Sequence, residues 1–202
     1  MILYPPTQEG IEQAALSIRA GHIVAYPTET VYGLGVDPFN ADALDRLFRA
    51  KGRDASKAIL LIVGNVGDIS VVATEVSETA RSLMSHFWPG PLSLLLPPTE
   101  RIPQSLTAGS GKICVRCPSS EIARLLCLAA GGPITSTSAN RSGAAPAECV
   151  GDIRLKGVAC AIDAGTLAPS EPSTVYDPDE DRIYREGRIT RREIDSIRAT
   201  MS

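Results

Sequence analysis

Ile59-Leu60-Leu61-Ile62-Val63 is the stretch that decides the fold of this chain. An unbroken apolar run of this length predicts a short strand that is buried on both of its faces. Such a strand needs helices on both sides of its sheet, which is typical of a parallel or mixed sheet in an α/β protein. The sequence therefore predicts an α/β fold, with a twisted mixed sheet and helices around a concave cavity.

The segments on either side of this strand alternate as expected for an α/β chain. Helical spacing of apolar residues predicts helices over 8–19, 76–87 and 120–130, and one that starts at the cap Asn40 and ends near Lys51. Short apolar runs predict strands over 22–26, 92–96, 113–116, 134–136, 158–162 and 173–176. Thr190 should cap a last helix, with Glu193 as its capping-box partner. Residues 167–178 carry three prolines and predict an ordered loop that crosses the ligand site.

Composition bounds the class of protein. With 44% hydrophobic and 21% charged residues, the 202 residues can bury a sizeable core, and we expect a single domain over residues 1–202. No apolar run approaches the roughly 20 residues that a membrane span requires. Five cysteines, an odd number scattered along the chain, argue against a disulfide framework. We therefore expect a cytoplasmic protein with no membrane contact.

The net charge of the chain favours a protein that binds small molecules over one with a broad nucleic-acid interface. The net charge is −3 and the isoelectric point is about 5.5, which does not suggest an extended basic face. Basic residues nonetheless cluster within 46–57 and within 182–192. Either cluster could be a solvated helix face, with part of its charge neutralised by neighbouring carboxylates.

Several familiar motifs fail when their mechanism is considered. Residues 109–112, Gly-Ser-Gly-Lys, lack the earlier glycine and the following Ser/Thr of a phosphate-binding P-loop. Gly33-x-Gly35 lacks the third glycine of a dinucleotide fingerprint. Cys114 and Cys117 lie three apart on a predicted strand, so they point to opposite faces and cannot grip one metal ion. The two histidines border apolar elements without a nearby nucleophile, which argues against a Ser/His/Asp enzyme.

Two polar loops carry the strongest functional signal. Residues 134–143, ITSTSANRSG, place hydroxyl groups and an amide behind a short apolar entry. Taken alone, this loop is most simply a surface turn. Residues 26–35, YPTETVYGLG, follow a buried strand, and their proline and glycines predict a tight polar backbone passage. Loops of this kind can hold phosphate oxygens and a small zwitterion if cations such as Lys51-Gly52-Arg53 and Lys57 are supplied from elsewhere.

These loops and four further motifs resemble the YrdC/Sua5 family, whose members make threonylcarbamoyl-AMP for a modified adenosine of tRNA. The further motifs are KGR (51–53) followed by Lys57, WPGP (88–91), VR (115–116) and STV (173–175). Together the matches run from residue 22 to about 188, in the family's order. The resemblance implies a YrdC-like fold and an L-threonylcarbamoyladenylate synthase of the short, single-domain form.

The implied reaction begins with threonine and bicarbonate, which give N-carboxy-threonine. Its carbamate attacks the α-phosphorus of ATP and expels pyrophosphate, with Mg²⁺ arriving together with ATP. An anionic nucleophile needs no strong general base, so catalysis rests on positioning and on electrostatic stabilisation. The product would supply the threonylcarbamoyl group of N6-threonylcarbamoyladenosine at position 37 of tRNA, through transient downstream transfer proteins.

The resemblance also implies roles for matching residues. Lys51 and Arg53, in an extended loop after a helix, would contact the ATP phosphates and the developing charge as the catalytic pair. The rest of the nucleotide site would be Lys57, Ser138, Asn140 and Arg185. Arg116 would hold the threonine carboxylate as a bidentate fork, a geometry that favours arginine over lysine. The amino-acid side would be completed by Thr28, Ser136 and Ser173.

Two departures and two alternatives stand beside this interpretation. Asp54 replaces the usual proline after the K-x-R motif, and Lys57-Ala58 stands where the family usually has Asn-Pro or Lys-Gly. One alternative is a double-stranded RNA-binding or ribosome maturation factor of the same fold, against which the acidic isoelectric point argues. The other is carbamoyl transfer in metal-cluster maturation, where related domains occur in larger proteins with zinc-finger motifs that this sequence lacks.

Overall fold

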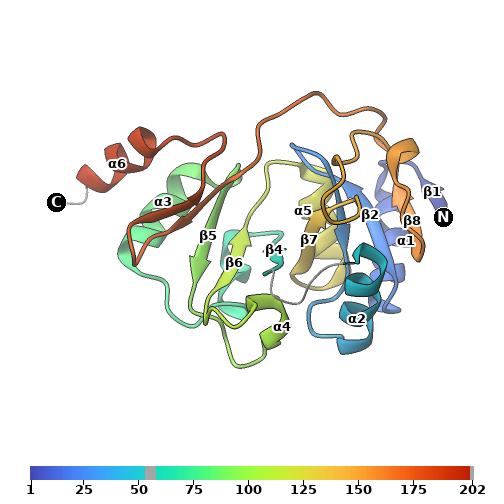
Figure 1. Ribbon diagram of the computed structural model, residues 1–202, viewed down its shortest axis with the longest axis horizontal. Helices are drawn as coiled ribbons and strands as arrows, with labels where there is room; N and C mark the ends of the chain where they lie inside the picture. The colour runs from blue at the N-terminus through green and yellow to red at the C-terminus, as the bar shows by residue number, and fades with distance from the viewer. Residues whose placement is uncertain (53–57, 201–202) are drawn as a thin grey trace.

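The computed structural model describes residues 1–52 and 58–200, which are organised around a mixed sheet of ten strands (Figure 1). The strand order is β1-β8-β2-β3-β7-β4-β6-β5-β9-β10. The strands are β1 (Ile2–Tyr4), β2 (Ile23–Pro27), β3 (Tyr32–Gly35), β4 (Leu60–Ile62), β5 (Leu92–Leu96), β6 (Ile113–Arg116), β7 (Ile134–Ser138), β8 (Val158–Ile162), β9 (Thr174–Asp177) and β10 (Arg182–Arg185). The predicted α/β class with a twisted mixed sheet is confirmed.

Helices pack on both faces of this sheet. They are α1 (Gln8–Arg19), α2 (Ala41–Lys51), α3 (Glu78–Phe87), α4 (Gln104–Thr107), α5 (Glu121–Ala130) and α6 (Arg191–Ala199), with short 3₁₀ segments η1 (Val66–Val71) and η2 (Val150–Asp152). The predicted caps are confirmed, because the Asn40 side chain accepts from the Ala43 amide and Thr190 shares a full capping box with Glu193. Within the described residues, no helix combines the length and the apolar character that crossing a bilayer requires.

The core explains why the strands are apolar on both faces. On β2, Ile23 and Ala25 enter one core cluster, whereas Val24 and Tyr26 enter the other. The first cluster includes residues of α2 and α3, and the second joins α1 and α5, which pack against each other. On β4, Leu61 and Ile62 divide between the clusters in the same way. The predicted burial of β4 on both faces is therefore confirmed.

The β2–β3 hairpin was not predicted as such. The sequence indicated a tight polar passage over residues 26–35, but residues 32–35 of it form β3 and pair antiparallel to β2, with Tyr26 opposite Gly33. The glycines are needed because the Tyr26 ring lies over them: a Cβ at Gly35 would stand 2.9 Å from Tyr26 Cε1. The alternation of apolar residues that marks a strand could not be seen in the sequence of β3, because its two glycines contribute no apolar side chains.

Two edge strands and one short helix were also missed. β1 pairs in parallel with β8, and β10 pairs antiparallel to β9, so the basic residues at 182–185 lie on a strand instead of a helix face. Both strands are short and lie at the sheet edges, where a strand pairs on one side only and need not be apolar. The four-residue helix α4 is too short to show a helical period.

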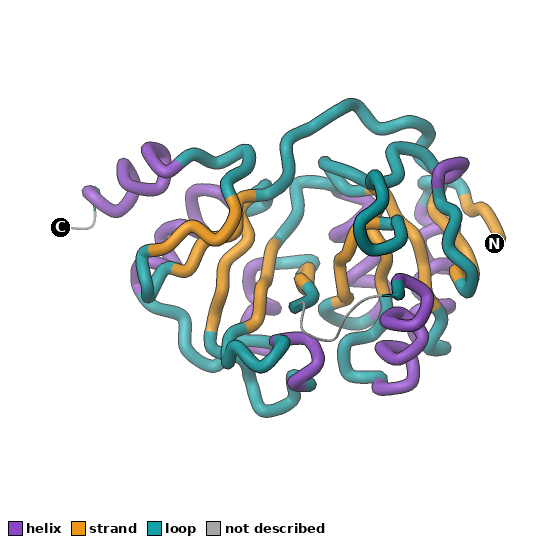
Figure 2. Tube along the Cα trace, in the orientation of Figure 1, coloured by secondary structure: helices purple, strands orange, loops and turns teal. Residues whose placement is uncertain are grey.

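A long connection crosses the molecule between β8 and β9. These strands lie near opposite edges of the sheet, and residues 163–173 join them across one side, as Figure 2 shows in teal. Tyr32 Oη anchors the connection: it donates to the Gly165 carbonyl and accepts from the Ala164 amide, each at 2.9 Å. The predicted loop over 167–178 is correct up to Ser173, and the strand predicted over 173–176 is β9 (Thr174–Asp177).

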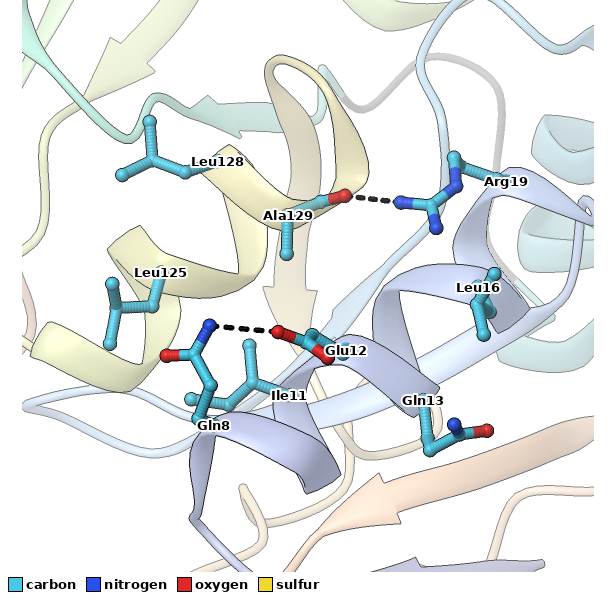
Figure 3. A pocket seen from close by; sticks show the side chains of 9 residues that line it. All are labelled: Gln8, Ile11, Glu12, Gln13, Leu16, Arg19, Leu125, Leu128 and Ala129. Atoms are coloured by element: carbon cyan, nitrogen blue, oxygen red, sulfur yellow. Dashed lines mark hydrogen bonds between the residues drawn. The ribbon is translucent and has the colours of Figure 1, made fainter.

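A groove of about 470 Å³ lies on the outer side of the helical layer formed by α1 and α5 (Figure 3). Its wall contains two hydrogen bonds, from Gln8 Nε2 to Glu12 Oε1 at 2.9 Å and from Arg19 to the Ala129 carbonyl. None of the predicted site residues lines this groove. The candidate site is instead formed on the sheet.

Candidate functional site

The sheet register brings several of the predicted site residues to one face. Ser136 of β7 pairs with Leu60, and two residues further along β4 Ile62 pairs with Arg116 of β6. Side chains two residues apart share a face of a strand, so Ser136 and Arg116 lie on the same face. On the neighbouring strand β5, Leu94 pairs with Val115, which places Ser93 opposite Arg116 and on the same face of the sheet. Ser93 in turn pairs with Val175 of β9, and Val175 pairs with Arg185 of β10. The same face therefore continues to the edge of the sheet.

The polar side chains predicted for the site are costly to bury. The buried polar set includes five predicted site residues: Thr28, Lys51, Arg116, Ser136 and Ser173. Lys51 is 2% exposed and Arg116 3%, and they are the only buried Lys or Arg side chains among the described residues. A buried cation costs several kcal/mol unless its charge is compensated. Each of these two cations must therefore have a compensating partner.

Arg116 is compensated by Glu29. Nη1 of Arg116 donates to Oε1 of Glu29, whose side chain is 17% exposed. The other carboxylate oxygen of Glu29 accepts from the Ser120 amide at 3.4 Å, at the start of α5. Nε of Arg116 is buried and has no hydrogen-bond partner among the described residues. One donor of the guanidinium group is thus held by the protein, while a second still needs an acceptor.

Thr28 lies next to Glu29 in the turn between β2 and β3, and its hydroxyl organises that turn. It donates to the Val31 carbonyl at 2.7 Å and accepts from the amides of Thr30 and Val31, both at 3.2 Å. The turn is also tied to α5, because the Ser120 hydroxyl donates to the Pro27 carbonyl at 3.0 Å. These bonds place Glu29 where it reaches Arg116.

Ser173 and Arg185 lie at the other end of the row and contact each other. Nη2 of Arg185 donates to the Ser173 hydroxyl at 2.9 Å and to its carbonyl at 2.8 Å. The Ser173 hydroxyl also shares a hydrogen bond of 3.0 Å with the fully buried Ser93 hydroxyl. Burial raises the pKa of the nearby Cys114 thiol to about 12, and the Arg185 and Arg116 guanidinium groups oppose part of that rise. The thiol is therefore uncharged at neutral pH.

Lys51 has a different position from the one predicted. It was expected in an extended, at least partly exposed loop after the helix, but it is the last residue of α2, and Gly52 caps the helix with a φ of 57°. Its Nζ donates to the carbonyls of Ser138 and Asn140, so the ammonium group is enclosed by the 134–143 loop. The prediction failed because sequence shows the end of a helix, but not which distant loop covers it.

Of the remaining predicted nucleotide-site residues, Ser138 and Asn140 belong to the described structure, whereas two others do not. Ser138 and Asn140 follow Ser136 on the same chain segment, and Asn140 Oδ1 is buried without a hydrogen-bond partner among the described residues. Arg53 and Lys57, together with the departure at Asp54, lie outside the described residues. Contacts and register link some of the predicted residues with one another: Lys51 with Ser138 and Asn140, Ser136 with Arg116, and Ser173 with Arg185.

Sequence reasoning missed Glu29, Ser93 and Cys114 as members of this site. Ser93 had a readable signal, since it is the only polar residue in the apolar strand β5. Glu29 had a weaker one, as a carboxylate in a short turn directly after a buried strand. No group of three or more His, Cys, Asp or Glu side chains arranged to hold a metal ion occurs among residues 1–52 and 58–200.

A mixed α/β sheet with buried Lys and Arg side chains among hydroxyl groups has the chemistry that suits a small anionic ligand. The comparison with known families is more specific. Residues 17–187 match the Sua5_yciO_yrdC family, which carries the description "Telomere recombination", and the chain belongs to this family.

Two curated relatives of the chain carry the name threonylcarbamoyl-AMP synthase. It is 39% identical over 170 residues to the threonylcarbamoyl-AMP synthase of Thiobacillus denitrificans, covering 83% of this chain and 90% of the relative. It is 38% identical over 192 residues to the synthase of Pyrococcus abyssi, covering 93% of this chain but only 56% of that longer relative. The solved structure of P. abyssi Sua5 complexed with L-threonine has a TM-score of 0.90 at 35% identity, covering 97% of this chain and 59% of the other.

Proposed function

We propose that this chain synthesises threonylcarbamoyl-AMP from L-threonine, bicarbonate and ATP, with release of pyrophosphate. The observation that carries the proposal is the burial of two cationic side chains, Lys51 and Arg116, both of which lie in the part of the chain that matches the family. Its relatives carry the corresponding name, and one related structure is a complex with L-threonine. The product would supply the threonylcarbamoyl group for the modified adenosine of tRNA.

The amino acid would bind beside Arg116. Its carboxylate supplies two acceptor oxygens, and Nε of Arg116 is a buried donor that lacks an acceptor in the described structure. Thr28, Ser136 and Ser173 would surround the remaining polar groups of threonine, since all three are buried near this face. The hydroxyl groups can both donate and accept, as a zwitterion requires.

The nucleotide would bind towards the 134–143 loop. Lys51 and Arg53 would contact the phosphates, with Lys57, Ser138, Asn140 and Arg185 completing this side. The bond from the carbamate oxygen to the α-phosphorus forms as the bond to pyrophosphate breaks, and pyrophosphate leaves with the electron pair. Fixed cations would stabilise this developing charge without reorganising. Mg²⁺ would enter with ATP, because its preferred ligands are phosphate oxygens and water.

The cellular setting remains part of the proposal. The product would pass to transient downstream proteins that transfer the threonylcarbamoyl group to tRNA, in the cytoplasm. A direct test incubates the protein with ATP, L-threonine, bicarbonate and Mg²⁺, and follows pyrophosphate together with the adenylate by mass spectrometry. Formation of both, dependent on threonine and on bicarbonate, is the expected result. Folded protein that forms no adenylate, but binds double-stranded RNA in a salt-dependent gel shift, would overturn the proposal.

A further inference from the structure

Glu29 is the one carboxylate in direct contact with the buried Arg116 among the described residues. It comes from the β2–β3 turn and is fixed there from two sides, by the hydroxyl network of Thr28 and by the Ser120 amide. The start of α5, where Ser120 caps the helix, also favours a negative charge at this point. Glu29 is thus held by the scaffold, independently of any ligand.

The geometry of the contact leaves part of Arg116 free for a ligand. A guanidinium group is planar and carries five N–H donors, so it can serve two carboxylates on different edges. Glu29 takes Nη1, while Nε is buried and has no hydrogen-bond partner among the described residues. A second acceptor is therefore required at the Nε side.

We propose, on the basis of the function proposed above, that Glu29 is a positioning residue for threonine recognition. It neutralises Arg116 and fixes the plane of its guanidinium group, so that the Nε side points to the substrate carboxylate. It does not contact the substrate itself. The guanidinium group of Arg116 can bind a carboxylate through two N–H groups only when its plane is correctly oriented. Loss of Glu29 should therefore weaken threonine binding and leave ATP binding unchanged.

The contrasting interpretation predicts a change of the threonine KM in the opposite direction. If Glu29 occupied the place of the substrate carboxylate and had to be displaced, its removal would lower the threonine KM, because a competitor would be gone. If Glu29 positions Arg116, its removal raises that KM. The direction of the change therefore decides between the two.

The experiment measures pyrophosphate release by Glu29→Gln and Glu29→Asp while threonine and ATP are varied separately. For Glu29→Gln we expect the threonine KM to rise by about ten- to a hundredfold, the range for losing a charged hydrogen bond. The ATP KM should stay at the wild-type value. Glu29→Asp keeps the charge on a shorter side chain and should give an intermediate threonine KM, which shows rescue by the conservative variant.

A second arm tests whether Glu29 acts through Arg116. In an Arg116→Lys background, Glu29→Gln should add little to the threonine KM, because both changes disturb one unit. Glu121→Gln is the matched control: it removes an exposed carboxylate from the first turn of α5 and should leave both KM values unchanged.

Three outcomes would overturn the assignment: a threonine KM that falls in Glu29→Gln, one that is unchanged in both variants, or full additivity with Arg116→Lys. Failure of the proposed function is recognised separately, because the wild-type protein would then form no threonylcarbamoyl adenylate. In that case calorimetric binding of L-threonine to wild type and Glu29→Gln still measures the role of Glu29. Equal affinities would refute it.

Discussion

Lys51 illustrates how burial changes the meaning of a single residue. Its ammonium group lies against two backbone carbonyls and is 2% exposed, so it both closes the 134–143 loop onto α2 and places a positive charge at the predicted phosphate site. A lysine with this double role affects stability and activity together. A lysine that reached the phosphates from an exposed position would affect activity alone.

For Lys51→Ala we expect pyrophosphate release to fall by on the order of a hundredfold or more, as for the loss of a preorganised charge donor. Stability should also fall by about 1–3 kcal/mol, because two carbonyls lose their donor. Urea denaturation and the pyrophosphate assay measure the two effects. Combination with Arg53→Ala should be less than additive, because residues that clamp one phosphate chain act as a unit.

Lys156→Ala serves as the control, since it removes an exposed lysine and should change neither quantity. Near-normal turnover by folded Lys51→Ala protein would contradict the assignment of this residue to the phosphate site. The RNA-binding alternative would then gain support.

At Arg116 the test is a change of shape at constant charge. Arg116→Lys should raise the threonine KM by about tenfold or more and affect ATP binding less, because an ammonium group cannot present a planar two-pronged donor. Separate titrations of the two substrates provide the measurement, with the exposed Arg154→Lys as control. Equal losses for both substrates would mean that Arg116 supports the pocket as a whole.

The β2–β3 hairpin shows how an element can serve a site at a distance. Its glycines allow the Tyr26 ring to lie flat against β3, and the Tyr26 hydroxyl donates to the Thr135 carbonyl of β7 at 3.0 Å. Burial raises the pKa of Tyr26, so the hydroxyl keeps its proton and remains a donor over the physiological range. The hairpin thereby fixes both the Glu29 turn and the strand that carries Ser136.

Gly35→Ala should destabilise this element. The new Cβ would stand 2.9 Å from Tyr26 Cε1 and 3.1 Å from Ile134 Cδ1, so the ring or the strand must move. We expect a loss of about 1–3 kcal/mol of unfolding free energy, typical of overpacking. Thermal and urea denaturation provide the measurement. Gly67→Ala meets no atom within 4 Å and is the matched control; an equal effect at both glycines would contradict the argument.

Across the whole molecule, the site depends on how β7 joins the two parts of the sheet. β7 pairs with β3 on one side and with β4 on the other, so the 134–143 loop leaves the sheet between the hairpin of Glu29 and the strand next to Arg116. The connection over residues 163–173 then delivers Ser173 from the far edge. The contacts among residues of these distant segments depend on this strand order.

The packing of the whole molecule also predicts which thiols react. All five cysteines are free, and Cys149 is the only one that is not buried. Burial raises the pKa of the Cys114, Cys117, Cys127 and Cys160 thiols, which lowers their thiolate fraction. Iodoacetamide on native protein should therefore label Cys149 first, with the others following only on unfolding. Mass spectrometry with and without urea tests this, and rapid native labelling of Cys114 would contradict it.

Local patterns in the chain were enough for much of the fold. The helix bounds of α1, the caps Asn40 and Thr190 and the apolar strand β4 follow from periodicity and capping, which act over a few residues. β1, β3 and β10 could not be predicted in this way, because edge position and glycine content remove the period of two.

By itself, the sequence determined the α/β class, the family motifs and the identity of the candidate residues, because each depends on residue types at short spacing. Only the tertiary structure decided that Lys51 is enclosed by the 134–143 loop, that Arg116 is held by Glu29, and that the Ser173 hydroxyl lies between Ser93 and Arg185. Those contacts link residues up to 89 positions apart. They depend on strand order and register, and a single strand does not encode which partner will lie beside it.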